Sequence, residues 1–132
     1  MYYLEKEFWI CCSHRLHNVE LTDEENKEIF GKCNMLPNHG HNYKIILGLE
    51  SKRLNQTTGM IVNFYDLKKI FNDVIDIPFD HKCLNECPEF KDIIPTAENM
   101  SKIFFDLLKP YIDELYSIKI YETSGSSAQY VE

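Results

Sequence analysis

The sequence predicts a single α+β domain over residues 1–132, built from a four-stranded antiparallel sheet with two helices on one face. This length suits one hydrophobic core. In four stretches apolar and polar residues alternate, as in strands with one buried face, and in two others apolar residues recur every three to four positions, as in amphipathic helices. The order is strand, strand, helix, helix, strand, strand. Because two helices cover only one face of such a sheet, we expect other subunits to bury the remaining face or the edges.

The first half of the chain predicts two paired strands and a short connecting helix. Residues 2–14 form the first strand, because their even positions are largely apolar. Thr22 followed by Glu25 predicts a capping box, and Gly31 predicts the end of the short helix that it opens. Residues 41–49 alternate in the same way and are expected to pair with the first strand.

The second half predicts the two helices and the last two strands. Asn63 caps the first helix and Pro78 is expected to end it, because proline cannot continue a helix beyond its first turn. Thr96 caps the second helix, which is expected to end near Pro110. Residues 115–123 and 128–131 are expected to be strands, with the turn between them at Gly125.

The composition narrows the choice of partners and compartment. With 21 acidic and 14 basic side chains the formal charge is −7, which disfavours nucleic acid and anionic membranes as partners. No stretch approaches the roughly 20 apolar residues of a membrane helix, and the first residues lack the pattern of a secretory signal. The five cysteines, with Cys11 adjacent to Cys12, cannot all pair, so we expect reduced thiols and a cytoplasmic protein.

Three histidines form the strongest chemical signal. His39 and His41 are two residues apart in a predicted strand, so their side chains point to the same side. His14 is the last residue of the first strand and falls on the same even positions as its apolar residues. Pairing of the two strands could bring His14 beside His39 and His41. Three histidines leave one position of a tetrahedral zinc open, as in catalytic sites. His17 is expected to be a loop residue without a ligand role.

Four further residues are candidates for a role in catalysis. Cys33 lies six residues before His39, and a thiol beside a cation can act as nucleophile or base, although an inert buried thiol is the alternative. Asp80 could orient and charge the imidazole of His81. Glu122 continues the apolar parity of its strand, so it either accepts N–H groups of a ligand or lies past the strand end in water.

Other motifs are weak or missing. Cys83 and Cys87 have no second pair at zinc-finger spacing and are not expected to bind metal. The sequence has no glycine-rich phosphate loop, no serine nucleophile elbow and no paired-cysteine redox motif.

Seven short blocks resemble, in order and spacing, the 6-pyruvoyl-tetrahydropterin synthase family, and the resemblance covers nearly the whole chain as one domain. The blocks are Ser13-His14-Arg15-Leu16, Phe30-Gly31-Lys32-Cys33-Asn34, His39-Gly40-His41-Asn42-Tyr43, Gly59-Met60 running to Asp66-Leu67-Lys68, Asp80-His81-Lys82, Pro95-Thr96-Ala97-Glu98-Asn99 and Tyr121-Glu122-Thr123.

The resemblance implies a fold, an assembly and a substrate. The fold is the tunnelling fold, in which three subunits close their sheets into a barrel and two such trimers typically stack into a homohexamer. The substrate is 7,8-dihydroneopterin triphosphate, a small-molecule pterin from which triphosphate is eliminated. Zinc is held by the histidines that match His14, His39 and His41.

The resemblance also implies roles for the remaining candidates. The residue matching Cys33 is the base that abstracts a proton, and those matching Asp80 and His81 assist it as a relay, often from a neighbouring subunit. The residue matching Glu122 anchors the pterin amino and ring N–H groups. Thr96 could help to bind the pterin, but its role as helix cap explains it equally well.

Two branches of the family differ in product. One makes 6-pyruvoyl-tetrahydropterin for tetrahydrobiopterin, and the other, the 6-carboxytetrahydropterin synthase of queuosine biosynthesis, releases acetaldehyde and triphosphate from the same substrate. Five residues separate Cys33 from His39, which resembles the pyruvoyl branch. From a different class, a pterin- or metal-binding module that has lost catalysis is the further alternative. Basic residues beside the candidates could bind the triphosphate, or they could point away from the site as strand neighbours and be solvated; they are Arg15, Lys32, Lys44 and Lys82.

Overall fold

The computed structural model describes all 132 residues and confirms the α+β fold. Its helices and strands are β1 Tyr2–His14, α1 Asp23–Phe30, β2 His39–Ser51, α2 Phe64–Phe71, α3 Ile77–Phe79, β3 Lys82–Cys83, α4 Ala97–Leu108, β4 Leu115–Thr123 and β5 Ser126–Val131. Short turns of 3₁₀ helix follow α1, β3 and α4, and a π-helical turn joins α2 to α3.

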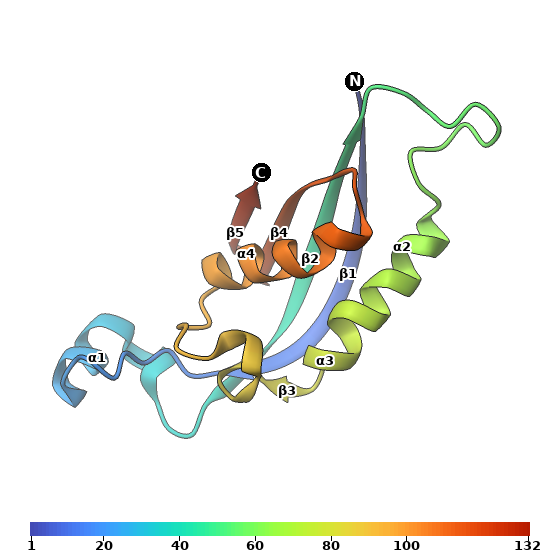
Figure 1. Ribbon diagram of the computed structural model, residues 1–132. Helices are drawn as coiled ribbons and strands as arrows, with labels where there is room; N and C mark the ends of the chain where they lie inside the picture. The colour runs from blue at the N-terminus through green and yellow to red at the C-terminus, as the bar shows by residue number, and fades with distance from the viewer.

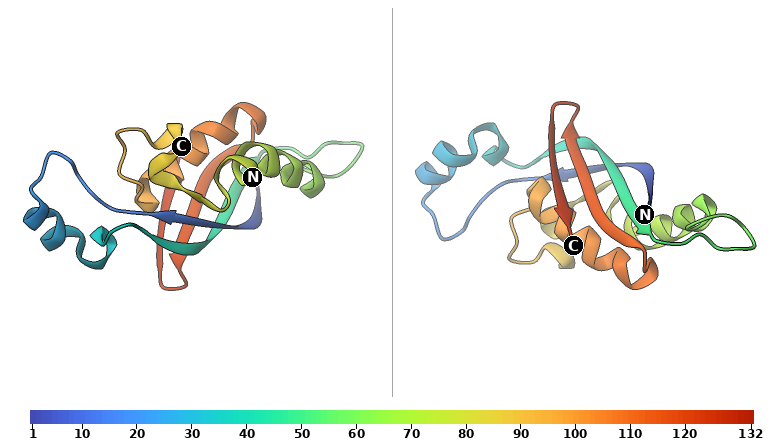
Figure 2. Two further views of the ribbon diagram at one scale, coloured as in Figure 1. Left: turned by 90° about the horizontal axis from the view of Figure 1, so that it is seen from below. Right: turned by 90° about the horizontal axis from the view of Figure 1, so that it is seen from above.

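The helices α2, α3 and α4 lie on one side of the sheet, as the sequence predicts (Figure 1). The connecting helix α1 lies beyond the end of the sheet where β1 ends and β2 begins, whereas the loop before α2 lies at the opposite end (Figure 2). No helix of the chain is both long enough and apolar enough to cross a bilayer. All five cysteines are free.

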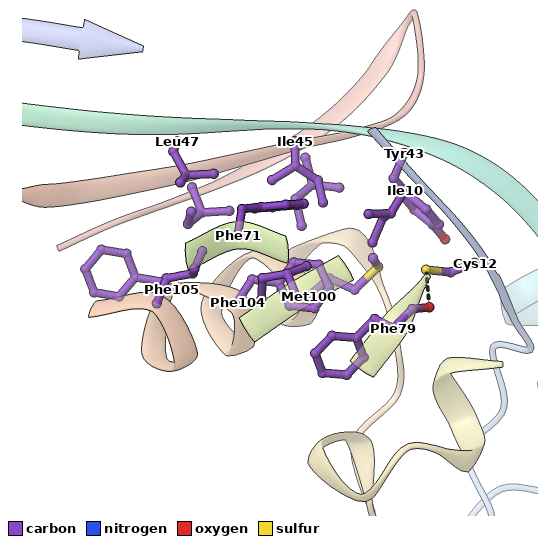
Figure 3. Close-up of a cluster of buried hydrophobic side chains, with 14 of the residues drawn as sticks. Ile10, Cys12, Tyr43, Ile45, Leu47, Phe71, Phe79, Met100, Phe104 and Phe105 are labelled. Atoms are coloured by element: carbon purple, nitrogen blue, oxygen red, sulfur yellow. Dashed lines mark hydrogen bonds between the residues drawn. The ribbon is translucent and has the colours of Figure 1, made fainter. Parts of the chain in front are cut away.

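The register of β1 against β2 decides which side chains meet. The two strands pair antiparallel along their whole length, from Tyr2 opposite Ser51 to His14 opposite His39. Apolar side chains of both strands therefore point to the helices and form the core with α2, α3 and α4 (Figure 3). The core side chains labelled there are Ile10, Cys12, Tyr43, Ile45, Leu47, Phe71, Phe79, Met100, Phe104 and Phe105. The histidines lie where this core-facing side reaches the end of the sheet.

The sheet has five strands rather than the four predicted, in the order β3-β1-β2-β4-β5. The additional strand, β3, is parallel to β1 and pairs only at Cys12 with Lys82 and at Ser13 with Cys83. The prediction missed it because two residues are too few to show an alternating pattern. Since β3 covers so little of β1, most of that strand remains an open edge.

The prediction that Pro78 ends the first long helix is confirmed to within one residue, because the last helical residue is Phe79. The chain stays helical from Phe64 to Phe79, passing through the π-helical turn Asn72–Asp76 into α3, where Pro78 lies in the first turn. Proline is tolerated there because its missing N–H falls where the regular hydrogen-bond pattern is already interrupted. The helix therefore delivers Asp80 directly to the edge of β1.

Gly48 allows the close approach of β2 and β4 at a bulge in their pairing. A Cβ at this buried position would overlap the Ser117 hydroxyl oxygen and lie 3.1 Å from the ring of Tyr116. We expect Gly48→Ala to lower the free energy of unfolding by about 1–3 kcal/mol, as overpacking of a core does. Urea unfolding measures the loss. Adding Ser117→Ala should recover part of it, and equal stability of the wild type and the single variant would contradict the explanation.

Candidate metal centre

Three histidines meet where β1 ends and β2 begins. His14 and His39 are direct cross-strand partners, and their Nε2 atoms lie 3.0 Å apart. The ring of His41 lies 4.8 Å from that of His39 and 5.2 Å from that of His14, measured between ring centroids. The alternating period of the strands and their register together bring the imidazoles to one place.

Glu122 of β4 completes this cluster. Its Oε1 lies 3.1 Å from His41 Nε2. One donor atom from each of His14, His39, His41 and Glu122 lies within 4.8 Å of the others. The side chain therefore faces the histidines and does not point into open solvent, as the alternative interpretation of the sequence would have it.

The state of the ring nitrogens fits a bound cation. His14 Nδ1 lies 2.8 Å from the carbonyl oxygen of Pro95, and because that oxygen only accepts, Nδ1 carries the proton and Nε2 keeps a free lone pair. His41 Nε2 is buried, and although Glu122 Oε1 lies 3.1 Å away, the two atoms are not aligned as a hydrogen bond. The 3.0 Å between His14 and His39 is close to the roughly 3.3 Å that two nitrogens at about 2.0–2.1 Å from a tetrahedral zinc would have. The cluster could therefore hold a metal ion.

Burial favours the metal-binding form of His14 and His41. Desolvation lowers the pKa of His14 below the ordinary histidine value, although the hydrogen bond to Pro95 and the charge of Glu122 act in the opposite direction. Desolvation also lowers the pKa of His41, again against the charge of Glu122. Neutral imidazole is the ligand form, so both shifts favour coordination.

Two residues that support His14 were missed by the sequence analysis. The Pro95 carbonyl orients the ring, and the Tyr43 hydroxyl lies 3.2 Å from the same Nδ1. Tyr43 is fully buried, and this burial, followed by the charge of Glu122, raises its pKa. Tyr43 points to the same face of β2 as His39 and His41, so the alternating pattern of the strand could have indicated that it lies near them. Pro95 is 81 residues from His14 and gave no signal.

Cys33 lies in the 3₁₀ turn Gly31–Asn34 and is partly exposed. Its carbonyl accepts a hydrogen bond of 2.9 Å from Leu16 N, which attaches the turn to the residues after His14. Cys12 differs strongly from it, because burial and the nearby Asp80 raise the pKa of the Cys12 thiol to about 12. Cys12 is thus an inert core residue, whereas Cys33 is accessible.

Asp80 and His81 form a hydrogen-bonded pair at the edge of β1. Asp80 Oδ2 lies 2.8 Å from His81 Nδ1, Oδ1 accepts from Cys11 N at 2.8 Å, and His81 N donates to Cys11 O at 2.6 Å. His81 adopts a φ of 59° and its side chain is 78% exposed. The imidazole is therefore oriented by Asp80 but does not contact the histidine cluster of its own chain.

The remaining candidates lie outside the cluster. The Thr96 hydroxyl accepts from Asn99 N at 3.2 Å and caps α4. Cys87 and Cys83 join no group of metal-binding side chains. Lys44 lies on the opposite face of the sheet, where it contacts Glu7 at 3.7 Å, and Arg15 Nε donates to the carbonyl of Asn34 at 2.8 Å. Lys32 and Lys82 are exposed.

Asp80 gives a prediction about pH. Partial burial acts to raise its pKa, but the hydrogen bonds from Cys11 and His81 outweigh burial and lower the pKa. A lowered pKa contributes stability that is present above the unfolded value of about 3.9 and is lost as the pH falls through the folded value. We therefore expect the metal-free wild type to be more stable than Asp80→Asn at pH 7, with the difference beginning to shrink near about pH 3.9 and disappearing once the pH is below the folded pKa. Urea unfolding at a series of pH values from 7 downward tests this, and a difference independent of pH would contradict it.

The subunit has an α+β fold, and three histidines and a carboxylate converge at the end of its sheet. The fold and the site together place the protein in the class of α+β proteins with a candidate metal centre on the sheet. The profile of the family described as "6-pyruvoyl tetrahydropterin synthase" matches residues 3–132. The 6-pyruvoyl tetrahydrobiopterin synthase of Poecilia reticulata is 42% identical over 89% of this chain and 81% of its own, and that of Homo sapiens is 40% identical over 89% and 83%. The solved structure of Caenorhabditis elegans 6-pyruvoyl tetrahydropterin synthase has a TM-score of 0.92 at 35% identity, covering 99% of this chain and 95% of that one.

The chain therefore belongs to the 6-pyruvoyl tetrahydropterin synthase family, and with its named relatives it is a lyase. The resemblance found in the seven sequence blocks is confirmed. A 6-carboxy-5,6,7,8-tetrahydropterin synthase of Synechocystis is also similar, at 31% identity over 98% of this chain and 93% of its own.

Proposed function

We propose that this chain is a zinc-dependent 6-pyruvoyl-tetrahydropterin synthase. It eliminates triphosphate from 7,8-dihydroneopterin triphosphate and leaves 6-pyruvoyl-tetrahydropterin. The observation that carries the proposal is the cluster of His14, His39, His41 and Glu122, found in a chain about 40% identical to relatives that bear this name.

The three histidines hold the metal in this proposal. Nitrogen donors from three imidazoles suit zinc and leave one coordination position for the substrate. When bound, zinc acts as a Lewis acid that polarises the side-chain hydroxyl or developing carbonyl of the substrate, so that neighbouring protons are more easily removed. Pro95 and Tyr43 keep His14 in the required tautomer and orientation.

Cys33, as thiolate, removes the proton, and Glu122 binds the pterin. A carboxylate offers two acceptor oxygens, which match the pterin amino group and the adjacent ring N–H. Asp80 orients His81, which relays the proton. The Thr96 hydroxyl accepts one hydrogen bond from the helix, so its O–H and one lone pair remain to contact the pterin. The oxidation is internal to the substrate, so no redox cofactor is required.

The proposal includes a trimer, and a hexamer made of two trimers. Both outer strands of the sheet, β1 along most of its length and β5, have free edges that can pair with other subunits. In such an assembly the exposed His81 of one subunit, on the β1 edge, can serve the site of its neighbour. Of the four basic candidates, Lys32 and Lys82 are exposed in the single chain and can meet the triphosphate.

The pyruvoyl product is favoured by two observations. Five residues separate Cys33 from His39, as in the pyruvoyl branch, and the relatives near 40% identity over most of the chain carry that name. The second candidate, 6-carboxytetrahydropterin synthase, is supported by the more distant Synechocystis relative.

Product analysis tests the function directly. Zinc-loaded protein is incubated with dihydroneopterin triphosphate, triphosphate and acetaldehyde are assayed, and the pterin is identified by mass spectrometry. We expect triphosphate with a pyruvoyl product and no acetaldehyde. Acetaldehyde with a carboxy product would favour the second candidate. If a zinc-loaded oligomer released no triphosphate, the proposed activity would be refuted and the chain would instead be a non-catalytic binding module.

A further inference from the structure

The 3₁₀ turn that carries Cys33 is attached to the segment of residues 15–17, which directly follows the metal-binding His14. Four hydrogen bonds make this attachment. They run from Leu16 N to Cys33 O at 2.9 Å, from Arg15 Nε to Asn34 O at 2.8 Å, from Asn34 Nδ2 to Leu16 O at 2.8 Å, and between Asn34 Nδ2 and His17 Nδ1 at 2.9 Å. Every one of them involves Cys33 or the residue that follows it.

Asn34 has the central place in this attachment. Its side chain is the only buried one in the turn, with 5% of the residue exposed. Both amide hydrogens are used, one toward a carbonyl and one toward the imidazole of His17. Its own carbonyl receives the Arg15 side chain. Replacing the amide would leave two acceptors of the opposite segment without donors.

The surroundings provide no substitute for Asn34. Lys32 precedes Cys33 and is exposed, as are Met35, Leu36 and Pro37 on the other side. Because Lys32 and residues 35–37 are exposed, the hydrogen bonds to residues 15–17 place the thiol relative to His14, and the Asn34 amide makes two of the four. The opposite segment is itself fixed, since the Asn85 amide both accepts from Arg15 N and donates to Arg15 O at 2.8 Å.

We propose that Asn34 is the positioning residue of the Cys33 thiol, holding it at working distance from the metal centre. This inference rests on the proposed function, in which Cys33 removes the substrate proton. A misplacement of about 1 Å can cost about 100-fold in rate. In this proposal Asn34 contacts neither the substrate nor the metal. It acts through its hydrogen bonds to Leu16 and His17, which hold the turn that carries Cys33.

Asn34→Ala is compared with a matched control, Asn26→Ala. Asn26 is also a buried asparagine of the same connection, and its side chain bonds the backbone of Asn18, Leu21 and Thr22 but no atom of the Cys33 turn. Asn34→Asp is made alongside, because a carboxylate of the same shape cannot donate and should act like alanine. The readouts are kcat, KM, zinc content and the rate of Cys33 alkylation by iodoacetamide, followed by peptide mass spectrometry.

We expect both Asn34 variants to lose about 10–100-fold in kcat, with KM and zinc content unchanged. Their alkylation rate at Cys33 should change several-fold, whereas Asn26→Ala should keep the wild-type kcat and alkylation rate even where its melting temperature falls. The proposal is overturned by an unchanged kcat and alkylation rate in the Asn34 variants, by loss of their zinc, or by an equal kcat loss in Asn26→Ala. Failure of both Asn34 variants to fold, while Asn26→Ala folds, would also overturn it.

The alkylation readout separates this inference from the proposed function. If Cys33→Ala retained full turnover, the assignment of Cys33 as base would fail. The effect of Asn34 on the reactivity of the thiol would still be measured in the wild-type and variant proteins, and a change there would show that Asn34 controls the thiol whatever its role.

Discussion

Cys33→Ala is expected to lower kcat by about 10²–10⁴-fold, the usual contribution of a positioned general acid or base. Zinc content should remain at the wild-type level, because the thiol comes from a turn outside the cluster of donor atoms. Release of triphosphate at saturating substrate, together with metal analysis of the same sample, measures both quantities. The expected pattern is a loaded but inactive protein.

The matched control for this experiment is Cys83→Ala. Cys83 is also a free and partly exposed thiol, but it lies in β3 and belongs to no group of metal-binding side chains. Its variant should turn over at the wild-type rate. Equal turnover of Cys33→Ala and the wild type would refute the assigned base, and loss of zinc from Cys33→Ala would mean that the thiol binds the metal instead.

His39→Ala is expected to weaken zinc binding by more than about 100-fold, since even residues that only orient a ligand contribute about 10–100-fold. His39 is the ligand best suited to the test. It is partly exposed, whereas His14 is fully buried and bonded to Pro95, so that its loss would also disturb the core. Competition with a chromophoric chelator measures the affinity.

Thermal unfolding gives a second, independent readout of the same change. A ligand at about 100 times its dissociation constant stabilises the folded state by about 2.7 kcal/mol, so zinc should raise the melting temperature of the wild type and not that of His39→Ala. His17→Ala removes an imidazole from the neighbouring loop and should bind zinc normally. Full zinc occupancy in His39→Ala at the wild-type affinity would contradict the three-histidine site.

Much of the candidate site follows from local patterns. The alternation of the strands places His14 and His41 on the core-facing side, and the same reasoning applied to β4 places Glu122 there. The helix caps could also be predicted from sequence, because Thr22 and Thr96 accept hydrogen bonds from N–H groups of the first turns that they open, as their residue type predicts. These features depend on neighbours within a few residues and can therefore be predicted from sequence.

Other features depend on contacts between distant segments and could not be predicted. The two-residue strand β3 exists only because Asp80 and His81 bond the backbone of Cys11. The position of Lys44, by contrast, follows from local alternation: consecutive strand residues point to opposite sides of the sheet, so Lys44 faces away from the histidine block.

The sequence by itself determined the long helices and strands, the face of each of those strands and, through its motifs, the family. Only the tertiary structure decided the register that sets His14 opposite His39, the carbonyl of Pro95 that fixes its tautomer and the bonds of Asn34 that hold the Cys33 turn. The physical reason is range. Periodicity and capping are properties of residues close together along the chain, whereas a hydrogen bond between residues 81 positions apart forms only when the sheet and the segment before α4 have packed together.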